Sequence, residues 1–360
     1  MSARSVSLIL VLLAALRTGA ACGAAPTAPD ARLDAIVSAA MRAQQIPAVT
    51  VAVMTADRLV YSRAFGTADL ENSVPATPET LIRTASIAKP ITAVAAMTLA
   101  ESGKLDLDAP VQSYCAPFPP KQWPITTREL LSHTAGIRHY LPGEPEYTRH
   151  YQWLADGFAL FAGDPLLFRP GSAYAYSTYG YSVAGCAIEG ASGARFQDYV
   201  AEHVLKPAGM THTFVDNVFE IVPHRARGYQ KLDGAVKNAG LMDSSYKIPG
   251  GGYVTSAEDL VHFAAALLDG RLVKPASLTQ LWTATPVSGA NPYGLGFALP
   301  EGGKFVMHTG GQSGTSTELL IVPQTHFAVA VLANLEHAEL RDLVRAILEE
   351  MKQPLPATPK

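Results

Sequence analysis

The chain has little cysteine and little charge, and its one strongly apolar stretch is too short to cross a bilayer comfortably. Only 3 of its 360 residues are cysteine, 16% are charged, and the formal net charge is -3. Nothing in this balance suggests nucleic acid or an anionic membrane as a partner. Because 48% of the residues are hydrophobic, the chain is an ordinary globular one that can bury a large core.

Two families of motif are also missing. The 10 histidines include no His-Glu-x-x-His or comparable cluster, and the cysteines have no metal-ligand spacing, so we expect no metal and no cofactor. A Gly-x-Ser-x-Gly elbow, which an α/β-hydrolase needs between a strand and a helix, does not occur either.

The first 25 residues are typical of a secretory signal peptide. Arg4 precedes the apolar run 8–16, and small residues follow from Gly19 to Ala25. We therefore expect cleavage between Ala21 and Ala25 and a periplasmic or secreted protein without a membrane span. Cys22 offers an alternative, a lipid anchor on the first mature residue, although Gly19 stands where a large aliphatic residue is usual.

Two cysteines remain in the body of the chain, Cys115 and Cys186. They could pair in an oxidising compartment, or they could be two buried free thiols. The sequence leaves both interpretations open.

The segment from Ser86 to Pro90 is the strongest chemical signal. Ser86 and Lys89 are three residues apart, and an apolar helical pattern continues from Ile87 to Leu99 before Gly103 stops it. In a helix both side chains project from one face. Serine needs a base to become a nucleophile, and a lysine can serve only where burial or nearby positive charge leaves it partly neutral. The pair therefore predicts covalent acyl transfer.

The same spacing occurs a second time, at Ser244 and Lys247. Here Pro249 and the glycines 250–252 follow, which cannot continue a helix. We interpret these glycines as a close approach of backbone and assign them no chemistry.

The order of patterns along the chain predicts an α+β fold. A helix from Asp30 is followed by β runs over 49–54 and 59–65, and the end of the chain has β runs over 293–299, 304–308, 317–322 and 327–333 before a helix over 337–351. We predict a signal peptide at 1–25, a domain over 26–352 and a tail at 353–360. Within the domain, an antiparallel sheet flanked by helices comes from about 30–106 and 242–352, and a mostly helical lobe from about 107–241 is inserted between them.

Two further motifs complete an ordered set. Tyr176-Ser177-Thr178 follows the Ser-x-x-Lys pair in the middle segment, and His308-Thr309-Gly310-Gly311 follows on a β run near the end. With them, the chain resembles the penicillin-recognising serine hydrolases, which include class C β-lactamases, D-Ala-D-Ala carboxypeptidases and esterases. It is most similar to their mitochondrial serine β-lactamase-like branch and its bacterial relatives. The likeness spans roughly residues 33–333 and implies a β-lactamase/transpeptidase-like fold.

The resemblance implies a role for each motif residue. Ser86 would be the acylated nucleophile, Lys89 its activating partner, and Tyr176 the phenol that moves protons to and from the reacting groups. The backbone N–H groups of Ser86 and Gly311 would form the oxyanion hole. His308, Thr309 and Thr178 would border the substrate.

Two of these residues depart from the usual pattern. Thr178 stands where many relatives have asparagine, and His308 stands where lactamases usually keep lysine, so we expect a positive charge only partly present near neutral pH. Both changes weaken the case for a β-lactam carboxylate as ligand. We therefore expect an exported serine hydrolase acting on a small-molecule or peptide amide or ester, with peptidase, esterase and β-lactamase all open. A binding or scaffolding module that has lost turnover is the alternative.

Overall fold

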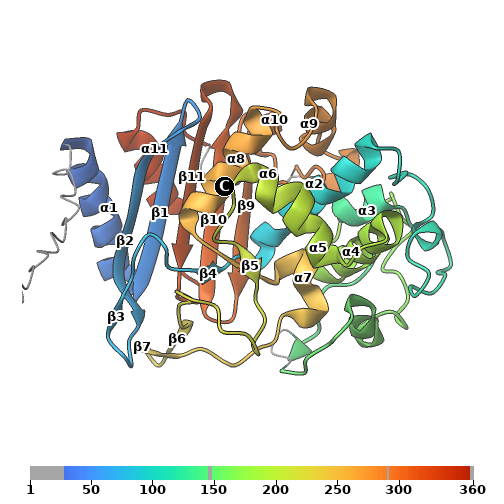
Figure 1. The fold of residues 1–360 in the computed structure, drawn as a ribbon, viewed down its shortest axis with the longest axis horizontal. Coiled ribbons are helices and arrows are strands. Elements are labelled where there is room, and N and C mark those ends of the chain that lie inside the picture. Colours follow the sequence, from blue (N-terminus) through green and yellow to red (C-terminus); the bar gives the residue numbers. More distant parts are fainter. Residues whose placement is uncertain (1–27, 145–147, 290–291, 357–360) are drawn as a thin grey trace, which may run out of the picture.

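The two ends of the chain meet in one antiparallel sheet. The computed structural model describes residues 28–144, 148–289 and 292–356, and its largest sheet has the strand order β3-β2-β1-β11-β10-β9 (Figure 1). The strands are β1 (Ala48–Thr55), β2 (Arg58–Asp69), β3 (Val74–Pro75), β9 (Val306–Gln312), β10 (Thr315–Val322) and β11 (Phe327–Ala333). β1 pairs with β11 antiparallel from Val49 to Thr55, so the predicted α+β fold with an antiparallel sheet is confirmed.

Helices cover both faces of this sheet. α1 (Ala28–Gln44) and α11 (Arg341–Glu350) lie on one face, where Val49, Val51 and Val53 of β1 pack with Leu33 and Ile347. α8 (Ala257–Leu268) lies on the other face, which Ala52 and Met54 of the same strand reach. This alternation follows from the two-residue period of a strand. The central strands β1, β10 and β11 are therefore buried between two hydrophobic layers (Figure 1).

The remaining elements lie mainly on the α8 side of the sheet (Figure 1). They are α2 (Ala88–Glu101), α3 (Thr127–Leu131), α4 (Thr178–Ser192), α5 (Phe196–Val200), α6 (Lys206–Ala208), α7 (Ile248–Gly251), α9 (Pro275–Leu281) and α10 (Pro300–Gly303), with the short strands β4 (Ile82–Arg83), β5 (Phe214–Val215) and β8 (Tyr253–Thr255) and the hairpin of β6 (Tyr229–Leu232) and β7 (Ala235–Asn238). The middle segment thus carries a hairpin besides its helices. Its boundary as a separate lobe stays a prediction.

Three predicted elements differ from the structure. Residues 293–299 form no strand, because Gly296 has a φ of +84° and reverses the chain, leaving isolated bridges. The next strand lies later than predicted, over Val306–Gln312, so the whole third motif is in β9. The last helix spans only Arg341–Glu350, since His337 has a φ of +57° that a helix cannot accommodate.

Cys115 and Cys186 form a disulfide, with 5.3 Å between their Cα atoms. The bond ties the segment before α3 to the middle of α4, and it decides between the two interpretations that the sequence left open. Among the described residues, no helix is both long and apolar enough to traverse a lipid bilayer. The predicted signal peptide and Cys22 lie outside the described residues.

Candidate active site

Ser86 and Lys89 lie at the start of α2. Ser86 is in a turn of 3₁₀ helix over Ala85–Ile87, and α2 begins one residue before Lys89. Ala85 has a φ of +46°, a conformation that is strained for a residue with a Cβ. Ser86 is partly exposed, whereas Lys89 is fully buried. A solvent-accessible hydroxyl therefore stands directly over a desolvated amine.

Lys89 makes three contacts that match the groups of a neutral amine. Its Nζ lies 2.8 Å from the carbonyl oxygen of Gly250, 3.1 Å from Thr178 Oγ1 and 3.0 Å from Ser86 Oγ. A carbonyl can only accept a hydrogen bond, and a hydroxyl can accept or donate. A neutral amine has two N–H groups and one lone pair, so it can donate to Gly250 and Thr178 while its lone pair faces the hydroxyl proton of Ser86.

The surroundings of Lys89 favour this neutral form. Burial lowers the pKa of Lys89 well below its usual value, and the positive charge of Lys247 lowers it further. Both effects disfavour the ammonium, since it loses water and faces a like charge. Among the described residues, no carboxylate pairs with Lys89 to oppose them.

Tyr176 is brought to Ser86 by the residues that begin α4. It directly precedes Ser177, whose Oγ accepts a hydrogen bond from the backbone N–H of Gly180 and so caps α4. Lys89 Nζ lies 4.7 Å from the centre of the Tyr176 ring. Burial raises the pKa of Tyr176, although a hydrogen bond with Ser86 acts in the opposite direction. The phenol is therefore protonated at neutral pH.

His133 packs against Tyr176, with 4.3 Å between the ring centres. Its Nδ1 accepts a hydrogen bond from the backbone N–H of Ser177, so the proton of the neutral ring is on Nε2. Burial lowers the pKa of His133 well below its usual value. His133 therefore supports the phenol ring of Tyr176.

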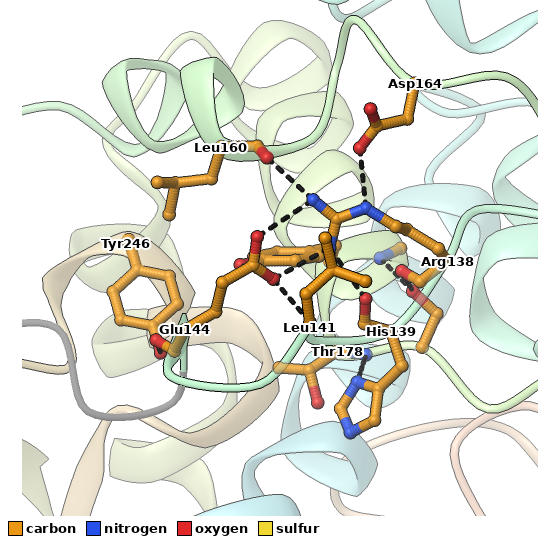
Figure 2. A network of polar contacts seen from close by, with 11 residues as sticks. Arg138, His139, Leu141, Glu144, Leu160, Asp164, Thr178 and Tyr246 are labelled. Atoms are coloured by element: carbon orange, nitrogen blue, oxygen red, sulfur yellow. Dashed lines mark hydrogen bonds and ion pairs between the residues drawn. The ribbon is translucent and has the colours of Figure 1, made fainter.

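A network of charged groups holds the 138–144 loop against the start of α4 (Figure 2). The Arg138 guanidinium donates to both carboxylate oxygens of Glu144, at 2.7 and 2.9 Å, and to the carbonyl oxygen of Leu160. Glu144 also accepts from the Tyr179 hydroxyl on α4. Because Arg138 and Glu144 are largely buried and paired, removal of Arg138 would leave the Glu144 carboxylate without its cation, whereas Arg138 also pairs with Asp164.

His139 links this loop to the site itself. Its Nδ1 accepts a hydrogen bond from the backbone N–H of Thr178 at 3.2 Å (Figure 2). Burial lowers the pKa of His139 to about 4, and the positive charge of Lys247 contributes. The loop therefore fixes Thr178 through a neutral ring, and Thr178 in turn contacts Lys89.

His308 on β9 is neutral as well. Its Nδ1 lies 2.6 Å from the carbonyl oxygen of Thr309, so Nδ1 carries the proton and Nε2 accepts from the Tyr293 hydroxyl at 2.9 Å. Burial lowers the pKa of His308 to about 3. The expectation of a partly present positive charge near neutral pH is therefore wrong, because burial removes the charge.

The rest of the third motif divides between the two faces of β9. His308 is paired with Leu319, whose side chain is in the α8-side core, whereas Thr309 is paired with Glu318. The Thr309 side chain therefore lies on the opposite face from His308. A Cβ at Gly310 would lie 2.5 Å from the carbonyl oxygen of Thr84, and one at Gly311 would meet nothing within 4 Å. Glycine at 310 thus lets β9 approach the turn that carries Ser86.

Besides His133, sequence reasoning missed the Gly250 carbonyl and the effect of Lys247 on Lys89. A Cβ at Gly250 would lie 2.5 Å from Thr178 Cγ2, so the predicted close approach of backbone is confirmed. Its chemical consequence was not foreseen, because it depends on where the carbonyl oxygen points. Within the described residues, no group of three or more His, Cys, Asp or Glu side chains is placed to hold a metal ion.

Comparison with known proteins places the chain in a family. A family model described as Beta-lactamase matches residues 33–351. The human mitochondrial serine beta-lactamase-like protein LACTB is 29% identical, over 77% of this chain and 69% of its own length. Protein flp of Staphylococcus aureus strain MW2 is 26% identical, over 87% of this chain and 64% of its own.

A solved structure shows the same likeness. The penicillin binding protein from Bacillus halodurans is 26% identical and superposes with a TM-score of 0.75, over 88% of this chain and 98% of its own. The resemblance predicted from the three motifs is thereby confirmed. The chain belongs to the Beta-lactamase family, and it is a serine hydrolase of that family.

Proposed function

We propose that the protein hydrolyses amide or ester bonds through an acyl-enzyme on Ser86. The observation that carries the proposal is the 3.0 Å contact between Ser86 Oγ and a fully buried lysine amine. A serine becomes nucleophilic when an adjacent base can take its proton. Lys89 has the lowered pKa and the free lone pair that this step requires.

The reaction can be written with the groups in this site. Ser86 Oγ attacks the carbonyl carbon of the substrate while its proton passes to Lys89 Nζ. The backbone N–H groups of Ser86 and Gly311 stabilise the negative oxygen of the tetrahedral intermediate. Tyr176 donates its proton to the leaving nitrogen or oxygen and is reprotonated from Lys89. Water then attacks the acyl-enzyme and gives a proton to the neutral amine of Lys89, and Ser86 Oγ takes that proton back as the bond to the acyl group breaks and the acid is released.

The neutral state of His308 bears on the substrate. A β-lactam presents a carboxylate, which a fixed positive charge would bind, and the His308 pKa of about 3 leaves no such charge on β9 near neutral pH. Thr178 contacts Lys89 through a hydroxyl, at the position where many relatives have the amide of an asparagine. These two features favour peptide amides or simple esters over β-lactams.

Export is a separate part of the proposal. The apolar run 8–16 with the small residues after it is typical of a signal peptide, and a disulfide between Cys115 and Cys186 suits an oxidising compartment. The human relative is named as mitochondrial. Mass measurement of the purified native protein tests this part, since we expect a mature chain that begins between residues 22 and 26.

A substrate panel tests the hydrolase. We would assay a chromogenic cephalosporin, a D-Ala-D-Ala peptide, short-chain esters and small peptide amides with the wild type and with Ser86→Ala. We expect repeated turnover of an ester or amide by the wild type and none by the variant. A stoichiometric adduct that never turns over would instead favour the alternative of a binding module, and equal turnover by both forms would exclude Ser86.

A further inference from the structure

Glu318 is a buried carboxyl on the far side of the strand that borders the candidate active site. It lies on β10, paired with Thr309 of β9 and Val331 of β11, and is 3% exposed. Its neighbours on the same face, Leu320 and Val322, pack into the core under α1 and α11. Glu318 therefore lies where this face of β10 changes from the apolar Leu320 and Val322 to the polar Ser316.

The Glu318 carboxyl lacks a partner in the described part of the chain, where it makes neither a hydrogen bond nor an ion pair. The positive charge of Arg341 lowers the pKa of Glu318, and the negative charge of Glu339 opposes that effect. Burial raises the pKa of Glu318 to about 7. An unpaired buried carboxylate costs several kcal/mol unless something compensates it. A bound cationic group would supply the missing partner.

A hollow beside Glu318 has room for such a group. It has a volume of about 580 Å³, and Glu318 lines it from the sheet. Thr309 and Gly311 of β9 form one rim, and the segment from His337 to Asp342 forms the other. Glu339 and Asp342 add negative charge at that second rim, against the positive charge of Arg341. Hydroxyl and carboxylate oxygens around one buried carboxyl suit an ammonium, which needs several acceptors at once.

The hollow also adjoins the proposed reaction site. β9 is the last strand in the order of the sheet, and Gly311, on its hollow side, is also the residue proposed as an oxyanion donor. If an extended ligand pairs with β9 as an added strand would, its successive substituents point alternately to the two faces of the sheet. A ligand lying along β9 can thus present one group toward Ser86 and the next toward Glu318.

We propose that this hollow is a subsite for an ammonium group carried by the substrate, with Glu318 as its counter-ion. The proposal rests on the proposed function, because it assigns the chemistry of a substrate that Ser86 would cleave. It names amine-bearing esters or amides, such as those with a lysine-like or amino-terminal ammonium, as the preferred substrate class.

Two matched esters test the preference. p-Nitrophenyl 6-aminohexanoate and p-nitrophenyl heptanoate differ by an ammonium in place of a methyl group. We expect the wild type to favour the amino ester by about tenfold or more in kcat/KM, mainly through KM, because a charge-assisted contact contributes on that scale. Glu318→Gln should bring the ratio of the two esters close to one. Glu349→Gln, on the exposed part of α11, should keep the wild-type ratio. A wild-type ratio near one, or one that Glu318→Gln leaves unchanged, would overturn the proposal.

Binding of hexylammonium separates this proposal from the proposed function. Calorimetric titration into the wild type needs no turnover, and we expect binding that Glu318→Gln weakens about tenfold or more. If neither ester is cleaved but hexylammonium binds through Glu318, the acyl-enzyme account fails and the subsite stands. If the esters are cleaved at Ser86 and hexylammonium does not bind the wild type, the subsite fails alone.

Discussion

The chain contains the Ser-x-x-Lys spacing twice, and only one copy brings its two side chains together. Lys89 Nζ lies 3.0 Å from Ser86 Oγ. Ser244 Oγ is buried without a hydrogen-bond partner in the described part of the chain, and Lys247 Nζ instead lies 5.5 Å from the ring centres of Tyr140 and Tyr246. Both lysines are buried and both have a lowered pKa.

The backbone explains the difference. From Ile87 to Ala88 the chain keeps right-handed helical angles and runs directly into α2, so Ser86 and Lys89 share a helix face. Lys247 has a φ of −136°, which breaks the helix between Ser244 and the four-residue α7. Sequence spacing is therefore insufficient, and an uninterrupted turn of helix is what places an amine against a hydroxyl.

Among these predictions, the largest difference in turnover is expected between the two serine-to-alanine variants, one in each copy of the spacing. We expect Ser86→Ala to lower kcat on the order of 10⁶-fold, since the bond-forming atom is lost. Ser244→Ala should keep wild-type turnover, because its hydroxyl is buried and unpartnered. Steady-state kinetics with the best ester of the panel measures both. Loss of turnover in Ser244→Ala, in a variant that melts at the wild-type temperature, would contradict the contrast.

Lys89→Met should give the next largest effect. Removal of a general base typically costs 10²–10⁴-fold in rate, and methionine fills the buried space without introducing a charge. We expect kcat to fall on that order with a retained fold, as measured by kinetics and circular dichroism. Near wild-type kcat in a folded Lys89→Met protein would show that some other group activates Ser86.

The tyrosines beside the two lysines should differ in the same way. Tyr176→Phe removes the proposed proton donor, and we expect a loss of about 10²-fold or more in kcat. Tyr246→Phe removes a buried hydroxyl that lies 3.3 Å from the carbonyl oxygen of Glu144. We expect it to cost about 1 kcal/mol of unfolding free energy, with little change in kcat. The opposite pattern, with Tyr246→Phe slower than Tyr176→Phe, would refute the assignment.

Lys247→Met should have the smallest effect, visible in the pH profile. The Lys247 charge lowers the pKa of Lys89, although burial is the larger cause. Without that charge the pKa of Lys89 rises, so more of the amine is protonated at a given pH. The acidic limb of kcat/KM should therefore move to higher pH by a small amount. A shift to lower pH would mean that Lys247 does not act on Lys89 as a like charge.

The sequence predicted what local periodicity determines. The Ser86/Lys89 contact follows from one turn of helix. The side chains of β1, β10 and β11 reach the two faces of the sheet in turn, because successive residues of a strand point to opposite sides. The strand expected over 293–299 failed because the positive φ of Gly296 does not follow from hydrophobic pattern alone. The Gly250 carbonyl, the His133 ring and the neutral state of His308 could not be predicted, because each depends on contacts between residues far apart in the chain.

Labelling with a fluorophosphonate, followed by peptide mapping, tests the central claim most directly. The account predicts one covalent adduct, on Ser86, that disappears in Ser86→Ala and forms far more slowly in Lys89→Met. An adduct on Ser244 or elsewhere, or labelling that persists in Ser86→Ala, would contradict it.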